Sequence, residues 1–470
     1  MGGMLDKPVT RKSSESGVDC GPLRLSWATS EMQGWRVSME DAHIALPVAL
    51  KRRPNAAALW TQTAVFGVLD GHGGAQVARF SSSHLPKELA KFPLSDGPER
   101  VRQFEEALRG AFHKIDDMLR GGQFAAEIHA LANPPSQNMG MAPGARGGDC
   151  TNVGCTACVC CVTETQIITA NAGDSRAVLC SDGKAIPLSE DHKPNEAREK
   201  DRIQAAGGWV EACGPGQFRV NGNLNLSRAL GDLEYKKDLN RPPEEQIICS
   251  TPDVTFRDRN LDKDEFLVIC CDGVWDVKTN QQVVDFLRSR LPPPDEAEGR
   301  ALELPLEALL DDCVSPDLRE THGLGGDNMT ALVVLLKPPS TAQAAGKTPK
   351  GSELAKARLI SCSCKEESVS SKAADGRSSG FVKVRLVLPS CLPVRDVCIF
   401  LAEDTPQLRV VTRMRSEGSL SSNIETFDLQ KELPEASVLS MGASPAKFTS
   451  STGSLRLTLQ WRSHARTCEP

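Results

Sequence analysis

The chain has 470 residues, of which 40% are hydrophobic and 25% charged, a composition typical of globular proteins with room for about three domains. Its net charge of −6 and single tyrosine exclude the basic surface and the stacking aromatics of a nucleic-acid-binding protein. No apolar run reaches the ~18 residues that span a bilayer, and no signal peptide is expected. Seventeen cysteines, mostly inside apolar runs, predict reduced thiols and a cytoplasmic or nuclear location.

The first 22 residues are polar, and we expect them to be flexible. Gly2 is a candidate for myristoylation, although Asp6 stands where the acylation motif has Ser or Thr. An acyl chain there, with the basic residues that follow, would give weak peripheral association with a membrane. The alternative is an unmodified N-terminus.

The segment 33–44 places Arg36 close to the adjacent carboxylates of Glu40 and Asp41, where a turn leads into a strand. Adjacent carboxylates repel each other unless they are solvated or bind a cation. The segment therefore indicates either a cation site or an ordinary acidic turn.

The apolar run 65–69 predicts a buried strand that ends at Asp70, followed by Gly71 and His72. Glycine allows a tight turn and a close approach to the main chain. An acid, a free backbone carbonyl and a histidine suit a hard cation with a proton donor beside it. An ordinary polar turn is the alternative.

Helical periodicity follows over residues 75–92 and 98–120, and the segment 121–149 is rich in Gly, Pro, Asn and Met, which predicts a loop or insertion. Two overlapping C-x-x-C spacings lie between Cys155 and Cys161. Zinc is one interpretation, but no second ligand pair follows, so a buried strand is favoured.

Strands at 166–170 and 177–180 flank a turn that carries Asp174. The segment 196–206 predicts a charged helix that ends at two glycines. Glycine-rich residues 211–225 predict a mobile loop.

Residues 266–271 repeat the pattern of 65–69, an apolar strand that runs into an acid, here Asp272. A second acid, Asp276, follows four residues later. The strand 330–336 is preceded by Asp327. Three acids at strand ends argue for convergence on a cation, and all-oxygen ligands favour Mg²⁺ or Mn²⁺ over zinc. Several carboxylates in one space need about two divalent ions, which is the arrangement of a phosphoester hydrolase.

The composition changes after residue 337. Residues 338–379 are rich in Ser, Ala, Lys, Pro and Gly, which predicts a linker. Residues 380–465 alternate between apolar and polar side chains, which predicts a small all-β, sandwich-like domain. This domain is either a protein-binding or regulatory module or a structural extension of the catalytic part.

Over residues 23–337 the chain resembles the metal-dependent Ser/Thr protein phosphatases of type 2C. The resemblance rests on ordered motifs: Arg36 with Glu40-Asp41, Asp70-Gly71-His72-Gly73-Gly74, Gly173-Asp174-Ser175-Arg176, residues 225–232, Cys271-Asp272-Gly273-Val274-Trp275-Asp276 and Gly326-Asp327-Asn328-Met329. It implies an α+β catalytic domain, a four-layer α-β-β-α sandwich of two antiparallel sheets.

The resemblance also implies roles for residues. One metal would be held by Asp70, Asp272 and Asp327, a second by Glu40, Asp70 and the Gly71 carbonyl, and a weaker third by Asp174, Asp272 and Asp276. Asp41 and Asn328 would act through water or hydrogen bonds, Arg36 would bind phosphate, and Lys193 and Arg219 would belong to a substrate-selecting flap. A metal-bridging hydroxide would attack phosphorus without a phosphoenzyme, and His72 would protonate the leaving oxygen.

The resemblance makes phosphorylated proteins the expected partners, and we expect a monomer. The sequence departs from the family pattern in two ways. Cys155 stands where the family commonly has Ser, and the insertion 121–149 and the tail after residue 337 are longer than usual. The non-enzyme alternative is a pseudophosphatase scaffold that binds partners through its C-terminal domain. A cysteine phosphatase would use C-x5-R, which the pairs Cys213–Arg219 and Cys313–Arg319 match, but without the strand-loop-helix setting.

Overall fold

The computed structural model describes residues 4–18, 23, 25–47, 60, 62–95, 97–132, 150–214, 216–297 and 299–336, together with eight strands between residues 358 and 463. The chain divides into two units, residues 1–341 and 342–470. None of the described helices combines the length and the apolar character that a membrane span requires. Gly2 lies outside the described residues.

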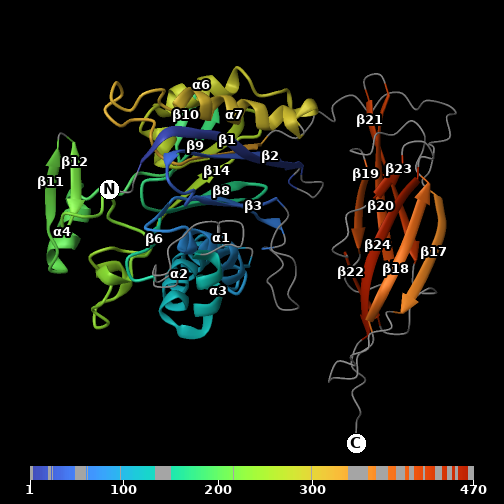
Figure 1. The fold of residues 1–470 in the computed structure, drawn as a ribbon, viewed down its shortest axis with the longest axis horizontal. Helices are drawn as coiled ribbons and strands as arrows, with labels where there is room; N and C mark the ends of the chain where they lie inside the picture. The colour runs from blue at the N-terminus through green and yellow to red at the C-terminus, as the bar shows by residue number, and fades with distance from the viewer. Residues whose placement is uncertain are drawn as a thin grey trace, which may run out of the picture. The chain divides into compact units, whose positions relative to one another are not determined.

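Two antiparallel sheets form the centre of the first unit (Figure 1). The first sheet has the order β1 (Met4–Val18), β2 (Ser26–Arg36), β16 (Met329–Leu335), β15 (Asp264–Cys270), β9 (Arg176–Ser181) and β10 (Lys184–Pro187). The second has the order β14 (Asp253–Asp258), β8 (Gln166–Ala172), β7 (Ala157–Val162), β4 (Ala64–Leu69) and β3 (Ala42–Leu46). Their central strands are buried on both faces, which explains why they read as continuous apolar runs.

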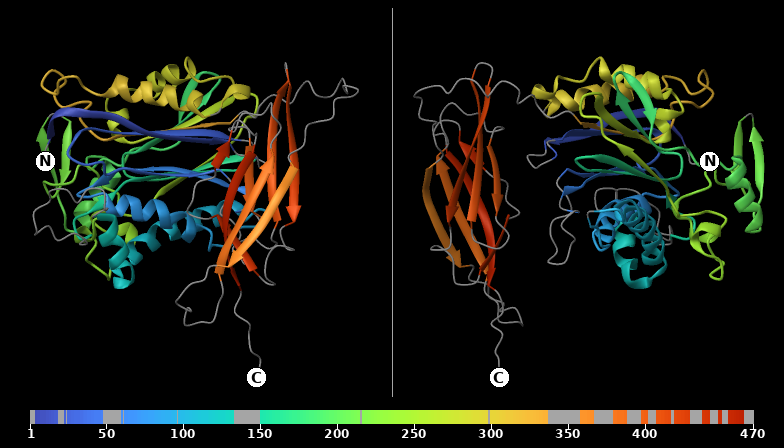
Figure 2. Two further views of the ribbon diagram at one scale, coloured as in Figure 1. Left: turned by 45° about the vertical axis from the view of Figure 1, so that its right-hand side comes forward. Right: turned by 180° about the vertical axis from the view of Figure 1, so that it is seen from behind.

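Helices cover the outer face of each sheet, as Figures 1 and 2 show. The second sheet packs against α1 (Gln76–Leu89), α2 (Arg100–Arg120) and α3 (Ala125–Ala132). The first packs against α5 (Asp272–Trp275), α6 (Asn280–Arg288) and α7 (Arg300–Cys313). A third apolar cluster lies between the sheets. The prediction of a mixed fold with antiparallel sheets between helices is confirmed.

The strand β4 shows how the layers are built. Val65 and Leu69 face the cluster under the helices, whereas Phe66 and Val68 face the cluster between the sheets. Alternate side chains of a strand point to opposite faces, so one short segment contributes to both cores. The same strand ends at Asp70 and thereby fixes where that carboxylate lies.

Two smaller parts complete the unit. A flap contains α4 (Ala197–Ala205) and the hairpin of β11 (Val210–Gly214) and β12 (Gln217–Val220), which projects from one side in Figure 1. A three-stranded sheet joins β13 (Leu230–Gly231), β6 (Gly154–Cys155) and β5 (Gly71–His72).

Several predictions of irregular structure are wrong. The N-terminal segment 4–18 is the long edge strand β1, because its backbone pairs with β2 although its side chains are polar. Residues 211–225 contain the β11–β12 hairpin, in which paired backbones replace the expected loop. The insertion begins with helical residues 122–132, and its remainder, 133–149, lies outside the described residues.

The cysteines of β6 and β7 are buried, and burial raises the pKa of the Cys158 thiol well above its usual value and that of Cys160 to about 12. A metal site needs the thiolate, which this environment disfavours. The strand interpretation of the C-x-x-C spacings is confirmed.

In the second unit, all described elements are strands. One sheet contains β17 (Arg358–Glu366), β18 (Ser379–Val387), β24 (Ser454–Ser463), β22 (Ser437–Met441) and β23 (Lys447–Thr449), and another contains β19 (Val397–Leu401), β20 (Gln407–Ser416) and β21 (Ser419–Asp428). Because β17 falls inside 338–379, that part of the predicted linker is wrong, while residues 338–357 lie outside the described residues. The sandwich arrangement and the role of this unit stay predictions.

The Phe66 ring is fully buried between the sheets. We expect Phe66→Ala to lower the free energy of unfolding by about 3–5 kcal/mol, because it leaves a cavity in a closely packed layer. Phe66→Leu should cost less than about 2 kcal/mol, since it keeps most of the volume. Denaturant unfolding measures both. Equal losses for the two variants would show that packing at this position does not hold the sheets together.

Candidate active site

The acids predicted from sequence are brought to one end of the sandwich by the sheet order. In the first sheet, β2 ends where its antiparallel neighbour β16 begins, and β15 ends beside the start of β9. In the second sheet, β4 ends where β3 and β7 begin. Since these ends coincide, the turns and strand ends that carry Arg36, Asp70, Asp174, Asp272 and Asp327 lie at the same edge.

Asp70 is fixed by its backbone. Its N–H donates to Thr156 Oγ1 at 3.0 Å, and its carbonyl accepts from the Thr156 N–H at 2.8 Å. Burial, followed by the charges of Asp272 and Asp41, raises the pKa of Asp70 well above its usual range. A Cβ on the next residue, Gly71, would come within 2.3 Å of the Glu40 carbonyl oxygen, so only glycine fits there.

Two further carboxylates have a buried oxygen without a hydrogen-bond partner. Asp41 accepts from Thr330 Oγ1 at 2.7 Å through one oxygen, while its Oδ1 has none, and burial raises its pKa to about 7. Asp272 Oδ1 is also unpartnered, and burial and the charge of Asp174 raise its pKa well above normal. Buried acceptors of this kind, crowded by like charges, fit a hard divalent cation.

Glu40 and Asn328 are tied together. Asn328 Oδ1 accepts from the Glu40 N–H at 2.9 Å, and the Glu40 carboxylate accepts from Ser38 Oγ at 2.7 Å and from the Gly74 N–H at 3.0 Å. These contacts fix the orientation of the carboxylate beside the glycine-rich turn. The Asn328 side chain thus contacts Glu40 directly, and its supporting role stays a prediction.

Asp327 lies against Arg36, whose Nη2 donates to its Oδ2 at 2.5 Å. Both side chains are about one-third exposed, at 36% and 35%, so the guanidinium is at the surface of the site. Planar guanidinium groups bind phosphoryl oxygens through two parallel hydrogen bonds.

Asp174 is buried and accepts from Lys193 Nζ at 2.5 Å. Asp276 follows α5, and burial raises its pKa while the Lys193 charge opposes that rise. Lys193 therefore lies with the predicted third-metal residues and not on the outer part of the flap. Arg219 of β12 donates to the Asn223 carbonyl in the turn that follows this strand.

In the described part of the chain, Asp41, Asp70 and Cys271 bring one ligand atom each within 4.8 Å of one another. The Cys271 thiol donates to the Asn328 carbonyl at 3.5 Å, and burial raises its pKa well above normal. Mg²⁺ and Mn²⁺ prefer oxygen ligands to sulfur, so the carboxylates of Asp41 and Asp70 are the members of this group that suit those ions. None of the predicted carboxylate trios reaches this spacing among the described residues.

The comparisons with known proteins agree with this geometry. A family model described as Protein phosphatase 2C matches residues 26–316. The chain is 36% identical over 366 residues to probable protein phosphatase 2C 21 of Arabidopsis thaliana, covering 73% of this chain and 95% of that protein. It is 41% identical over 335 residues to protein phosphatase 2C homolog 2 of Schizosaccharomyces pombe, covering 71% and 78%.

The chain belongs to the protein phosphatase 2C family. It is therefore a phosphatase, a hydrolase. The fold agrees, since a phosphatase structure from Toxoplasma gondii superposes with a TM-score of 0.51 at 21% identity, covering 71% of this chain and 98% of that one.

The site of this 2C phosphatase also includes Asp232, for which no role was predicted from the sequence. His72 Nε2 lies 2.7 Å from Asp232 Oδ2, whose side chain is 1% exposed. Burial lowers the pKa of His72, but the charge and hydrogen bond of Asp232 outweigh it, so the pKa is raised. Asp232 adopts a left-handed backbone, φ 49°, and Asp116 of α2 accepts from the preceding Gly231 N–H at 2.8 Å. The only sequence signal for Asp232 was its position at the end of the motif 225–232.

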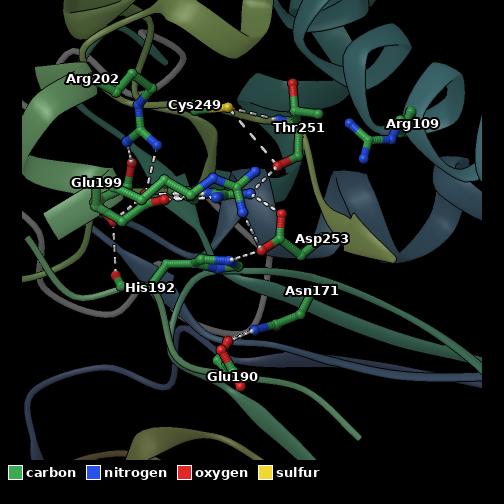
Figure 3. Close-up of polar contacts among 12 residues, drawn as sticks. Arg109, Asn171, Glu190, His192, Glu199, Arg202, Cys249, Thr251 and Asp253 are labelled. Atoms are coloured by element: carbon green, nitrogen blue, oxygen red, sulfur yellow. Dashed lines mark hydrogen bonds and ion pairs between the residues drawn. The ribbon is translucent and has the colours of Figure 1, made fainter. Parts of the chain in front are cut away.

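The flap of the phosphatase is joined to its body by a buried ion network (Figure 3). Arg228 pairs with Glu199 of α4 at 2.6 Å and with Asp253 of β14 at 2.7 Å. His192 Nε2 lies 3.3 Å from Asp253, and its Nδ1 accepts from the Gly173 N–H at 3.2 Å. The network thus connects the flap helix to the turn that carries Asp174.

We expect Asp232→Asn to lower kcat on a phosphoserine peptide by about 10–100-fold, because it weakens the positioning of a general acid. On p-nitrophenyl phosphate, whose leaving group needs no proton, the loss should be several-fold smaller. Steady-state kinetics on both substrates measure the contrast, and exposed Asp238→Asn is the control. Equal losses on both substrates would give Asp232 a purely structural role.

Burial raises the pKa of Glu199, but its bonds to Arg228 and Arg202 outweigh this and lower it to about 2 from 4.5. A lowered pKa stabilises the fold above the unfolded value, and this contribution is lost as pH falls from 4.5 toward 2. The difference in unfolding free energy between wild type and Glu199→Gln should be on the order of 3 kcal/mol at neutral pH and shrink below about pH 4.5. Denaturant unfolding from about pH 6 to about pH 3.5 tests this. A constant difference would contradict it.

Proposed function

We propose that this protein is a metal-dependent protein serine/threonine phosphatase that releases phosphate from phosphoserine and phosphothreonine. The observation that carries the proposal is the crowding of buried carboxylates at one edge of the sandwich, two of them with unpartnered oxygens, beside Arg36 and His72. The family assignment supports the same activity.

The donor chemistry of these residues, carboxylate and carbonyl oxygens with two unpartnered acceptors, fits divalent ions. Asp70 with Asp272 and Asp327 would hold one ion, Glu40 with Asp70 and the Gly71 carbonyl a second, and Asp174, Asp272 and Asp276 a third. Asp41 would support these positions, directly or through water. When bound, Mg²⁺ or Mn²⁺ supplies the Lewis acidity that activates water and neutralises phosphoryl charge.

The side chains have distinct tasks. Arg36 binds and orients the phosphoryl oxygens, and Asp327 holds its guanidinium at the mouth of the site. His72, held by Asp232, donates a proton to the leaving serine or threonine oxygen. We infer direct attack by water without a phosphoenzyme, as the resemblance implies. Burial raises the pKa of the Cys271 thiol beside the site, which makes this thiol a poor nucleophile.

The cysteine-phosphatase alternative has no support in the geometry. Cys213 and Arg219 lie in the two strands of one exposed hairpin. Cys313 ends a helix, and burial raises the pKa of its thiol to about 12. Neither thiol has the electropositive loop that makes a thiolate nucleophile.

The remaining expectations stay predictions. They are a monomeric state, a cytoplasmic or nuclear location, acylation of Gly2 with weak membrane association, and a protein-binding role for the C-terminal unit. A pseudophosphatase scaffold is the second candidate function, and the metal-dependence experiment below separates the two.

We expect purified protein to release phosphate from phosphoserine and phosphothreonine peptides only with Mn²⁺ or Mg²⁺, and Asp272→Ala to lower kcat at least ~100-fold, because it removes a ligand of two ions. Phosphate release against metal concentration measures this. The exposed Asp262→Ala is the control. Equal rates for wild type and Asp272→Ala at saturating Mn²⁺ would reject the enzyme and favour the scaffold.

A further inference from the structure

The edge strand β1 is held in the first sheet without an apolar anchor. Among the described residues, the buried apolar core includes no side chain of 4–18, and Met4 and Val9 are 48% and 39% exposed. Backbone pairing with β2 is interrupted twice between Met4 and Lys12. A strand with little buried apolar surface opens locally at low cost in free energy.

Polar side chains of β1 meet α7 in a regular series. The contacts are Lys12 Nζ to Asp311 at 2.5 Å, Ser14 Oγ to Glu307 at 2.8 Å, and Ser16 Oγ to Glu303 at 2.7 Å. Alternate strand residues are ~6.6 Å apart and helix residues four apart are ~6 Å apart, so the two spacings match. We call these three contacts the β1–α7 ladder. In it the Lys12 ammonium and the hydroxyls of Ser14 and Ser16 donate to carboxylates of α7.

We propose that Ser14 is a phosphorylation site whose modification releases β1 from α7. Arg11 and Lys12 stand three and two residues before Ser14, the charge pattern that basic-directed serine kinases recognise. Such a kinase transfers the γ-phosphoryl group of ATP to Ser14 Oγ. The bond to ADP breaks, the ester bond forms, and the hydroxyl proton passes to the base of the kinase.

The surroundings of Ser14 disfavour a phosphate. Its hydroxyl donates to Glu307 and also lies 3.0 Å from Ser30 Oγ, and a phosphoester oxygen has no proton to donate. Glu303 and Asp311 add negative charge on the same face of α7. Arg300 is already bonded to Glu307 and Glu303. A group of charge about −2 against this face therefore breaks the ladder.

Release of β1 would reach the site through β2. Val9 pairs with Gly34 and Met4 pairs with Arg36, the last residue of β2. Opening β1 removes backbone partners from the strand end that positions the Arg36 guanidinium. We expect weaker phosphate binding, seen in KM, and this second effect rests on the proposed function.

The experiment compares full-length protein carrying phosphoserine at position 14 with protein carrying it at position 13, kept in chelator to prevent self-dephosphorylation. Ser13 has the same local charge but is exposed on the other face of β1. Amide hydrogen exchange of residues 4–18 should be about tenfold faster with phosphoserine at 14 than at 13. Equal exchange overturns the proposal.

A second arm tests the cause. Glu307→Lys should restore slow exchange to the protein phosphorylated at Ser14, because it replaces repulsion by attraction. If exchange stays fast, the claim that repulsion at the β1–α7 ladder releases β1 is wrong.

A third arm incubates wild type with ATP and a basic-directed serine kinase and maps the phosphate by mass spectrometry. Phosphate on Ser14 supports the proposal, and its absence there overturns it. If exchange changes as expected but no phosphatase activity exists, only the proposed function fails.

Discussion

Electrostatic repulsion among buried carboxylates is the constraint on which the structure of the site depends. Asp70, Asp272 and Asp41 have raised pKa values because desolvation and the charges of neighbouring carboxylates disfavour their ionised forms. Several carboxylates crowded away from water lower the stability of a fold unless a bound cation compensates their charge. The sandwich therefore has to hold these groups rigidly, and the strand ends, the Thr156 contacts and the close approach at Gly71 do so.

The rest of the unit extends from that edge. Arg36 and His72 reach the same space from β2 and β5, and each is held by an acid, Asp327 and Asp232. The buried Arg228 network links the flap to the turn of Asp174. The edge strand β1 is the exception, because polar contacts alone hold its side chains to α7, which makes it suited to regulation.

Apolar runs that end in acids made much of this predictable from the sequence. The strand before Asp70 and the strand before Asp272 were foreseen, because burial on both faces leaves a strong pattern. The antiparallel sheets were expected only from the resemblance to the family. The strand β1 was not, because backbone pairing holds a polar sequence that has no apolar period. The partner of His72 was also missed, since Asp232 lies 160 positions away and only the fold brings the two together.

The most direct test of the central claim is anomalous diffraction from crystals of this protein grown with Mn²⁺. The account predicts anomalous peaks within bonding distance of carboxylate oxygens of Asp70 and Asp272, at the strand ends that carry these acids. Well-ordered carboxylates at that edge with no anomalous peak between them, at Mn²⁺ concentrations that saturate related phosphatases, would contradict it.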